Sequence, residues 1–407
     1  MQRTRVTLLL IVCLLAAPLA HAQRRRSVSV HDTVVIGGLF SLTGDGATLG
    51  RASEAALRIA ARDINVELAA LHFPFRVQAL VTDTQLRPSV AQEKIVELYD
   101  SGARFVIGPQ SSAEAGAVLP FANEHRMVLI SQGSTAFSLA IPNDSLFRLA
   151  PNDRLEGAAM AALMRADGVD VIVPVWRNDA GNTGLRDGVV QFFTAAGGEV
   201  HGGIPYDPAT TDFTAVAASL TALGNEAQNA RPAARIAVYL AGFEEAVAIL
   251  GHARLYPNLS GARWYGGDGL TQSQALLADP AIAAFAGATH FTAPAVGLGE
   301  TTRDRWEPLS EEIRARTGFV PDAFSLSVYD AAWVAILSHI ESHGEDELRR
   351  EAFVRNVQRY WGVTGPLALD EAGDRKIADF DLWTVENDAG VLGWVRTAQY
   401  TGGRLVR

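Results

Sequence analysis

The sequence predicts an α/β protein built from two doubly wound lobes, and three observations support this fold class. Short apolar runs alternate with segments of helical periodicity from residue 33 to about residue 267. The alternation restarts after Pro151-Asn152-Asp153, so one architecture occurs twice. Among 407 residues, 48% are hydrophobic and 20% are charged, which is enough apolar surface for two packed cores. Such alternation is typical of parallel sheets that helices cover on both faces.

The first half is predicted to contain four strands, each followed by a turn, with helices after the first three. The first helix carries an apolar stripe of i, i+3/i+4, i+7 spacing that begins at Leu49. Pro88 lies near the first turn of the second helix. Proline is tolerated there because the first N–H groups of a helix have no intrahelical acceptor. We expect strands at 34–40, 75–82, 104–108 and 127–131, and helices at 49–64, 88–100 and 112–124.

The second half repeats the pattern and then departs from it. We expect helices at 153–167, 182–197, 212–222 and 243–255, and strands at 169–176, 199–205, 236–240 and 263–267. Residues 224–234 are polar and contain a proline, which favours a loop. Residues 302–360 have the pattern of three helices. Alternating segments at 366–369, 378–385 and 390–394 predict short strands.

The N-terminus has the three parts of a secretory signal peptide. Arg3 and Arg5 form a basic region, residues 6–19 are an apolar run, and Ala20-His21-Ala22 is a cleavage site. We therefore expect residues 1–22 to be a cleaved signal peptide and the protein to be periplasmic or extracellular. The alternatives are an uncleaved anchor and a lipoprotein signal that uses Cys13. This is the single cysteine, so no internal disulfide can form.

Composition and motifs exclude several functions. The formal net charge of −10 disfavours nucleic-acid binding, which needs clustered lysine and arginine. Lys94 and Lys376 are the only lysines and neither follows a glycine, so the chain has no GxxxxGK[ST] phosphate loop. It also has no HExxH, GxSxG or CxxC motif. We therefore expect no enzyme activity, no metal site and no cofactor, with an exported α/β enzyme as a minor alternative.

Four polar turns follow predicted strands, and in open α/β sheets ligands bind beyond the carboxyl ends of the strands. The first turn, residues 41–50, contains G-x-G, but its third glycine arrives one residue late for a dinucleotide fingerprint. Asp83 could be the ribose-binding acid of such a site. A tight turn and a loop that lines a pocket are the alternatives, and the predicted export of the chain disfavours a dinucleotide.

Two hydroxyl-rich turns follow the third and fourth strands. Gly108-Pro109-Gln110-Ser111-Ser112 precedes a helix, where hydroxyl and free N–H groups suit a carboxylate. A serine N-cap is the structural alternative. Ser131-Gln132-Gly133-Ser134-Thr135 follows the neighbouring strand. Convergence of the two turns on one ligand would favour a binding role over simple capping.

The fourth turn, Gly266-Gly267-Asp268-Gly269, lies at a strand end in the second half of the chain. Its glycines would let a ligand approach the backbone, and Asp268 could pair with a cation. An Asp-Gly turn without a binding role is the alternative.

These turns carry a resemblance to the leucine/isoleucine/valine-binding proteins, the solute-binding proteins of branched-chain amino acid ABC transporters. The resemblance covers about residues 33–390 and depends on the order and spacing of its motifs. They are Gly38-Leu39-Phe40-Ser41-Leu42-Thr43-Gly44, Asp63-Ile64-Asn65, Ile107-Gly108-Pro109 with Ser111-Ser112, Ile130-Ser131 with Thr135, Tyr329-Asp330-Ala331, and Thr364-Gly365-Pro366-Leu367 with Asp370 and Gly373.

The resemblance implies the type I periplasmic-binding-protein fold, in which three crossovers join two lobes around a ligand cleft. It places residues 33–150 and 288–361 in lobe one and residues 151–287 and 362–407 in lobe two. Crossovers are expected near 150–151, 287–295 and 361–366. No cofactor is implied.

The resemblance also implies a ligand site for an amino acid. Ser112, Gly133 (through its backbone) and Thr135 would hold the α-carboxylate and α-amino group, with Ser111 and Ser134 beside them. Asp268 would take the ammonium from lobe two. Two further positions depart from the family: Phe243 stands where a tyrosine often closes over the ligand, and Gly181 stands near another tyrosine position. Leu49 would line the side-chain pocket.

We therefore expect a monomeric extracytoplasmic protein that captures an amino acid or a related small polar solute for an ABC permease. A sensor domain that works with a separate signalling partner is the alternative. The sequence does not name the ligand.

Overall fold

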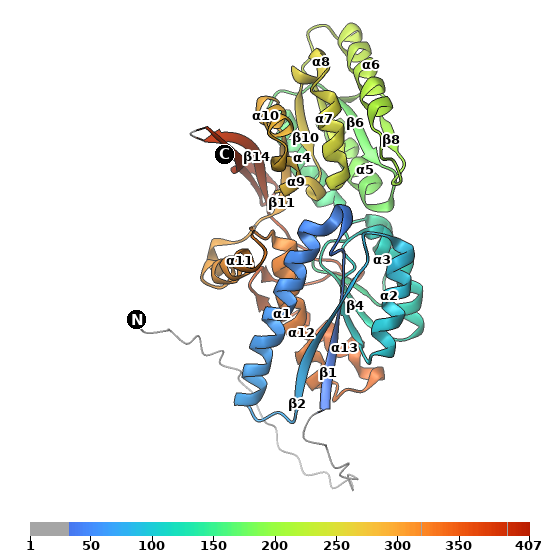
Figure 1. Cartoon of the computed structure of the whole chain (residues 1–407), viewed down its shortest axis with the longest axis vertical. Helices are drawn as coiled ribbons and strands as arrows, with labels where there is room; N and C mark the ends of the chain where they lie inside the picture. The colour runs from blue at the N-terminus through green and yellow to red at the C-terminus, as the bar shows by residue number, and fades with distance from the viewer. Residues whose placement is uncertain (1–31, 319, 389) are drawn as a thin grey trace.

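The computed structural model describes residues 32–318, 320–388 and 390–407, and it contains two α/β lobes, one above the other (Figure 1). Each lobe has its own sheet with helices on both faces, which confirms the predicted fold class. The predicted signal peptide and Cys13 lie outside the described residues. Helix α12 (Ala323–Glu341) is long and apolar enough to span a bilayer by composition, but most of it is buried inside lobe one.

The sheet of lobe one has five parallel strands in the order β2-β1-β3-β4-β5. Side chains alternate between its two faces: Phe105 and Ile107 pack toward α1 and α12, whereas Val106 packs toward α2 and α3. The strands are β1 (Asp32–Phe40), β2 (Phe75–Asp83), β3 (Phe105–Ile107), β4 (Val128–Ser131) and β5 (Leu146–Arg148). The helices are α1 (Ala47–Ala70), α2 (Pro88–Asp100), α3 (Ser112–Glu124), α11 (Arg303–Thr317), α12 and α13 (Asp346–Val357).

The sheet of lobe two follows the order β16-β15-β14-β11-β10-β9-β6-β7, and β8 also pairs with β6. Its strands are β6 (Val171–Arg177), β7 (Glu199–Val200), β8 (Ile204–Tyr206), β9 (Ile236–Ala241), β10 (Arg263–Gly266), β11 (Thr292–Val296), β14 (Phe380–Asp388), β15 (Val391–Thr401) and β16 (Arg404–Val406). Its helices are α4 (Asp153–Ala166), α5 (Ala180–Ala195), α6 (Thr214–Ala230), α7 (Val247–Ala253), α8 (Pro257–Ser260), α9 (Gln274–Ala278) and α10 (Pro280–Ala288).

Several predicted elements differ from the structure. The loop predicted at 224–234 is wrong up to Ala230, because α6 continues through it with a polar outer face while Ala227 packs inward. The predicted strand at 199–205 is two short strands, β7 and β8. The strand predicted at 366–369 is also wrong: Leu367 and Leu369 are buried in the core of lobe one, and the pairing here is limited to β12 (Trp361–Gly362) with β13 (Gly365–Pro366) and an isolated bridge between Leu369 and Arg375.

The chain passes between the lobes three times, but two passages lie later than the sequence predicted. The first follows β5, as expected. The second follows β11, which pairs with β10 in the sheet of lobe two although residues from 288 onward were assigned to lobe one. The third follows Arg375, because residues 362–375 pack on lobe one before β14 enters the other sheet.

The third passage is held to lobe one by a buried polar network. Asp330 on α12 accepts hydrogen bonds from the N–H groups of Val363 (2.7 Å) and Thr364 (3.0 Å) and from the Thr364 hydroxyl (2.7 Å). The Arg375 guanidinium donates to the Thr364 carbonyl at 2.6 Å. The buried backbone of this segment is thereby satisfied by side chains where no sheet is available.

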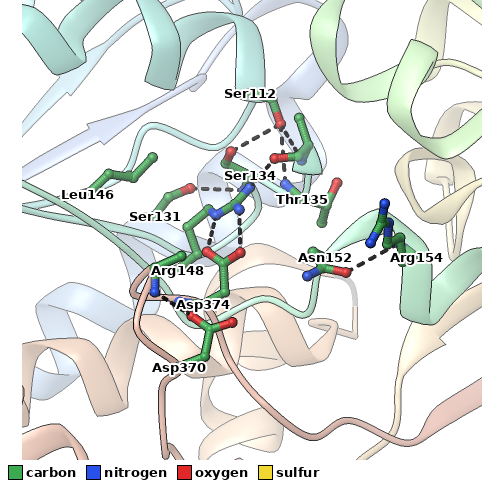
Figure 2. Close-up of polar contacts among 12 residues, drawn as sticks. Ser112, Ser131, Ser134, Thr135, Leu146, Arg148, Asn152, Arg154, Asp370 and Asp374 are labelled. Carbon is green, nitrogen blue, oxygen red and sulfur yellow. Dashed lines mark hydrogen bonds and ion pairs between the residues drawn. The ribbon is translucent and has the colours of Figure 1, made fainter. Parts of the chain in front are cut away.

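Beside this network, a bidentate ion pair joins the end of β5 to the returning chain. Arg148 Nε lies 2.6 Å from Asp374 Oδ1 and its NH2 lies 2.5 Å from Oδ2, as Figure 2 shows. Both side chains are 1% exposed. Arg148 also donates to the Ala136 carbonyl at 2.6 Å, so the same guanidinium supports the polar turn after β4.

We predict that Asp374→Ala lowers the free energy of unfolding by about 3–5 kcal/mol, because it leaves the Arg148 charge buried without a partner. Urea unfolding measures this loss. Glu307→Ala is the control, since Glu307 pairs with Arg303 at 3.1 Å on the surface and its loss should cost less than about 1 kcal/mol. Equal losses in the two variants would contradict the role assigned to the buried pair.

Candidate functional site

A cleft lies between the lobes at the carboxyl ends of their strands. Its walls come from the turns after β1, β3 and β4 and the start of α12 on lobe one, and from the turns after β9 and β10 on lobe two. The lining residues are Asp45, Gly46, Thr48, Leu49, Ala52, Gln110, Gly133, Val320, Pro321, Asp322, Phe324, Ser325, Phe243, Glu244, Asp268, Gly269, Thr271, Gln272 and Ser273.

Four of the nine predicted site residues line this cleft: Leu49, Gly133, Phe243 and Asp268. The other five lie behind its wall and are buried. They are Ser111, Ser112, Ser134, Thr135 and Gly181.

The two hydroxyl-rich turns of lobe one converge, as Figure 2 shows, and their hydroxyl groups bond to each other. Ser112 Oγ accepts hydrogen bonds from the N–H groups of Thr135 (3.2 Å) and Ala136 (3.1 Å) and from the Ser134 hydroxyl (3.0 Å). Ser131 Oγ accepts from the N–H of Ser134 at 2.9 Å. These bonds hold the turn that presents Gly133 to the cleft.

Glycine is required at position 133 by a close approach of two backbones. A Cβ atom there would lie 2.8 Å from the Gln110 carbonyl oxygen. Gln110 also stabilises the turn after β1. Its Nε2 donates to the Gly46 carbonyl at 2.9 Å, and its Oε1 accepts from the Ser41 N–H at 3.2 Å. The three turns of lobe one therefore form one connected wall.

Ser111 caps the N-terminus of α3, which was the alternative to a role in ligand binding. Its hydroxyl accepts from the Glu114 N–H (3.3 Å) and donates to Glu114 Oε2 (2.6 Å), which is a capping box at the start of α3. Asp83 also serves structure: it accepts from the N–H groups of Leu42 (2.8 Å) and Thr43 (3.3 Å). Asp83, the acid considered for a ribose, therefore holds the turn after β1 in place.

Gly181 lies on lobe two and faces the start of α3 on lobe one. A Cβ atom at Gly181 would lie 3.4 Å from Ser112 Oγ. The two helix N-termini thus approach each other closely at this end of the cleft. A tyrosine here would have to displace that contact.

Phe243 and Glu244 form the lobe-two wall opposite α1. The Phe243 N–H donates to Glu245 Oε1 at 3.3 Å, and the Arg177 guanidinium lies 5.6 Å from the Phe243 ring. Glu244 accepts a hydrogen bond from the Thr48 hydroxyl of lobe one, so the two walls touch across the cleft. Burial raises the pKa of Glu244, although the Thr48 bond opposes this.

Behind Asp268 lies a layer of buried carboxyl groups from the first turn of α4. Asp153 is 1% exposed and Glu156 is 3% exposed, and Glu156 Oε1 accepts from the Asp268 N–H at 3.2 Å. Gly184 makes room for this layer, because a Cβ there would lie 2.0 Å from Asp153 Oδ2. Lobe two therefore places three acids together at one point of the cleft.

Loss of contact with water is the largest cause of the raised pKa values of Asp153, Glu156 and Asp268. Burial raises the pKa of Asp268 to about 7. Burial, together with the charge of Asp268, raises the pKa of Asp153 to about 8. The pKa of Glu156 is raised by the same two causes. A cation placed against Asp268 would reverse these effects because it stabilises the ionised form.

The charge of the cleft has one sign. Four carboxyl side chains line it, from Asp45 and Asp322 on lobe one and from Glu244 and Asp268 on lobe two, and its described lining contains no lysine, arginine or histidine. Such a surface favours ligands with a cationic group and disfavours bare anions.

Sequence reasoning did not name several polar residues of the cleft as ligand contacts, among them Gln110, Glu244, Gln272 and Asp322. Asp322 had a usable signal, since an acid three residues before Ser325 opens the apolar helix α12 and caps it. Glu244 directly follows the predicted Phe243. For Gln110 and Gln272 the sequence offers only a position within a turn.

Comparisons with known proteins agree with this architecture. The family model described as periplasmic binding protein matches residues 33–390. An uncharacterised protein of Methanocaldococcus jannaschii is 27% identical over 392 residues, which are 91% of this chain and 90% of that protein.

Solved structures resemble the whole chain. A leucine-binding protein of Thermotoga maritima matches with a TM-score of 0.74 at 18% identity, covering 92% of this chain and 99% of that one. A solute-binding protein of an ABC transporter from R. palustris, in complex with benzoate, matches with a TM-score of 0.73 at 20% identity, covering 90% and 96%. At this identity the likeness establishes the fold.

The buried acids predict an unusual pH dependence of stability. A carboxyl whose pKa is higher in the folded than in the unfolded protein binds more protons when folded, so stability falls as pH rises from about 4 to about 8. Each unit of difference corresponds to about 1.4 kcal/mol. We predict that Asp153→Asn flattens this fall by a few kcal/mol at most, as urea unfolding from pH 4 to 8 measures.

The exposed control Asp304→Asn should retain the pH dependence of the unmodified protein. If Asp153→Asn and Asp304→Asn gave parallel stability curves, Asp153 would not be the source of the effect.

Proposed function

Because this chain belongs to the periplasmic binding protein family, we propose that it is an extracytoplasmic solute-binding protein that captures an amino acid between its lobes. It would deliver the bound solute to an ABC permease. The observation that carries the amino acid assignment is the one-signed charge of the cleft, with Asp268 in front of two buried carboxyl groups.

An ammonium group is the ligand feature that this arrangement requires. Asp268 is held in place by its own backbone bond to Glu156, so its carboxyl faces the cleft without a cationic partner in the lining. An ammonium would donate to it and offset the charge of the acids behind it. An aromatic acid such as the benzoate of the R. palustris protein has no group that does this.

The other end of the ligand would lie against lobe one. The turn at Gly133 lines the cleft, and the N-terminal end of α3 behind it has a dipole of the sign that suits a carboxylate. Thr135 and Ser134 would support this end, and Ser112 and Ser111 would act through the bonds that fix the two turns. Leu49 and Phe243 would contact apolar parts of the ligand, and Gly181 would allow the close approach of α5 to α3 behind the cleft wall.

The lobes would close around the ligand because its two binding groups lie on different lobes. A ligand that binds both Gly133 on lobe one and Asp268 on lobe two stabilises the closed form over the open form. The Thr48–Glu244 hydrogen bond would add to the same closed state. We propose that the permease recognises this state in a monomer of the protein, outside the cytoplasm. A sensor role would use the same closure with a different partner.

A thermal-shift screen tests the proposed ligand class. We predict that at least one amino acid at 100 times its dissociation constant adds about 2.7 kcal/mol of stability. The panel should hold amino acids, their amides and aromatic acids at equal concentrations. Stabilisation by aromatic acids alone, or by no member of the panel, would count against the proposal.

We also predict that Asp268→Ala weakens binding of the best amino acid by tenfold or more, because an ammonium loses a charged hydrogen-bond partner worth about 1.5–3 kcal/mol. Isothermal titration calorimetry measures the change. Asp207→Ala, an exposed acid on the same lobe, is the control and should bind as the unmodified protein does. An unchanged affinity in Asp268→Ala would mean that no amine is held there.

A further inference from the structure

We propose that the cleft selects amino acids whose side chain ends in a cation, and that this second cation is held by the acidic lining to which Asp322 contributes from lobe one and Glu244 from lobe two. The inference rests on the proposed function, since it keeps the α-ammonium at Asp268. It adds the substrate class, which the comparisons leave open.

The number of acids in the cleft exceeds what one ammonium can offset. Asp45, Glu244, Asp268 and Asp322 line the cleft, and the described lining contains no lysine, arginine or histidine. Arg51, outside the lining, is a cation that acts on Glu244. A neutral amino acid carries one ammonium and one carboxylate, so it adds no net positive charge. A basic amino acid brings a second cation, which offsets a second acid.

Asp322 is placed to meet a ligand as well as to cap α12. Its Oδ1 accepts from the N–H and the hydroxyl of Ser325, both at 2.8 Å, so its position is fixed at the cleft wall. Its charge reaches Asp268 on the other lobe and contributes to the raised pKa of that group. Asp322 and Asp268 therefore repel each other across the cleft, and a ligand with positive charge would relieve this repulsion.

A buried acceptor without a hydrogen-bond donor supports the same conclusion independently of charge. The Oε1 of Gln272, in the cleft wall itself, is buried and has no hydrogen-bond partner among the described residues. Unpartnered acceptors of this kind are rare in proteins, and a donor-rich ligand supplies what they lack.

The apolar part of the lining suits the stem of such a side chain. Leu49, Ala52, Val320 and Phe324 lie on lobe one beside Asp322, and Phe243 faces them from lobe two. A side chain with methylene groups and a cationic tip would bury its stem on these residues and keep its charge at the acids.

Matched ligand pairs test the inference by isothermal titration calorimetry. Lysine and norleucine share a stem and differ in the terminal ammonium, and arginine and citrulline are near-isosteres that differ in charge. We expect lysine to bind at least about tenfold tighter than norleucine, and arginine at least about tenfold tighter than citrulline. Norleucine or leucine binding as tightly as lysine would overturn the inference while leaving the proposed function intact.

Variants locate the second cation. Asp322→Asn retains a capping residue and should reduce the lysine-to-norleucine affinity ratio by about fivefold or more. Glu244→Gln should reduce the same ratio, which gives a second reading if one variant folds poorly. The matched control is Asp212→Asn, because Asp212 accepts from the N–H and hydroxyl of Thr214 in the same way but lies exposed, away from the cleft.

Each outcome decides between the two claims. An unchanged ratio in both Asp322→Asn and Glu244→Gln would overturn the placement of the second cation. Binding of aromatic acids without any amino acid would overturn both this inference and the proposed function. A ratio that also falls in Asp212→Asn would show a general charge effect and would overturn the assigned site.

Discussion

At the junction of the lobes the carboxyl groups of Asp153 and Glu156 are buried and that of Asp268 is partly buried, and no cationic side chain of the cleft lining offsets them. Removing charge from water is costly unless the charge is paired or neutralised. The charge of Arg148 acts on Asp153, but Arg148 already forms an ion pair with Asp374. The acids avoid this cost if they are protonated when no ligand is bound, or if they pair with a cation when a ligand is bound. Much of the surrounding structure accommodates them, including the glycine at 184.

Their position links the ligand to the hinge. Asp153 and Glu156 lie in the first turn of α4, directly after the first passage between the lobes. The Asp153 N–H donates to the Thr135 carbonyl at 3.0 Å, so this turn also contacts the loop that holds Gly133. An apolar cluster that includes Ala150, Val296 and Phe380 packs where the three passages run together. A charge placed at Asp268 thus acts on residues adjacent to the axis about which the lobes would close.

The sequence was sufficient to predict the fold class and most of the helices and strands. The sequence pattern predicted the first and last residues of α2 and α3 correctly, because a proline and a serine mark their starts. It missed β5, whose three residues are too few to show a period, and it ended α6 early because a polar helix face resembles a loop. In the site, Asp268 and Gly133 were found from strand-end turns. Gln272 could not be, since only tertiary folding brings the turn after β10 opposite the start of α12, and the sequence signal of Asp322 marks it only as the cap of that helix.

The central claim is that the cleft holds an amine against Asp268. Native mass spectrometry of the full protein tests it most directly, after incubation with an equimolar mixture of amino acids and aromatic acids followed by removal of free solute. We predict one retained mass, that of an amino acid, with the basic members of the mixture preferred. Retention of an aromatic acid, or of no solute at concentrations that saturate related proteins, would contradict the account.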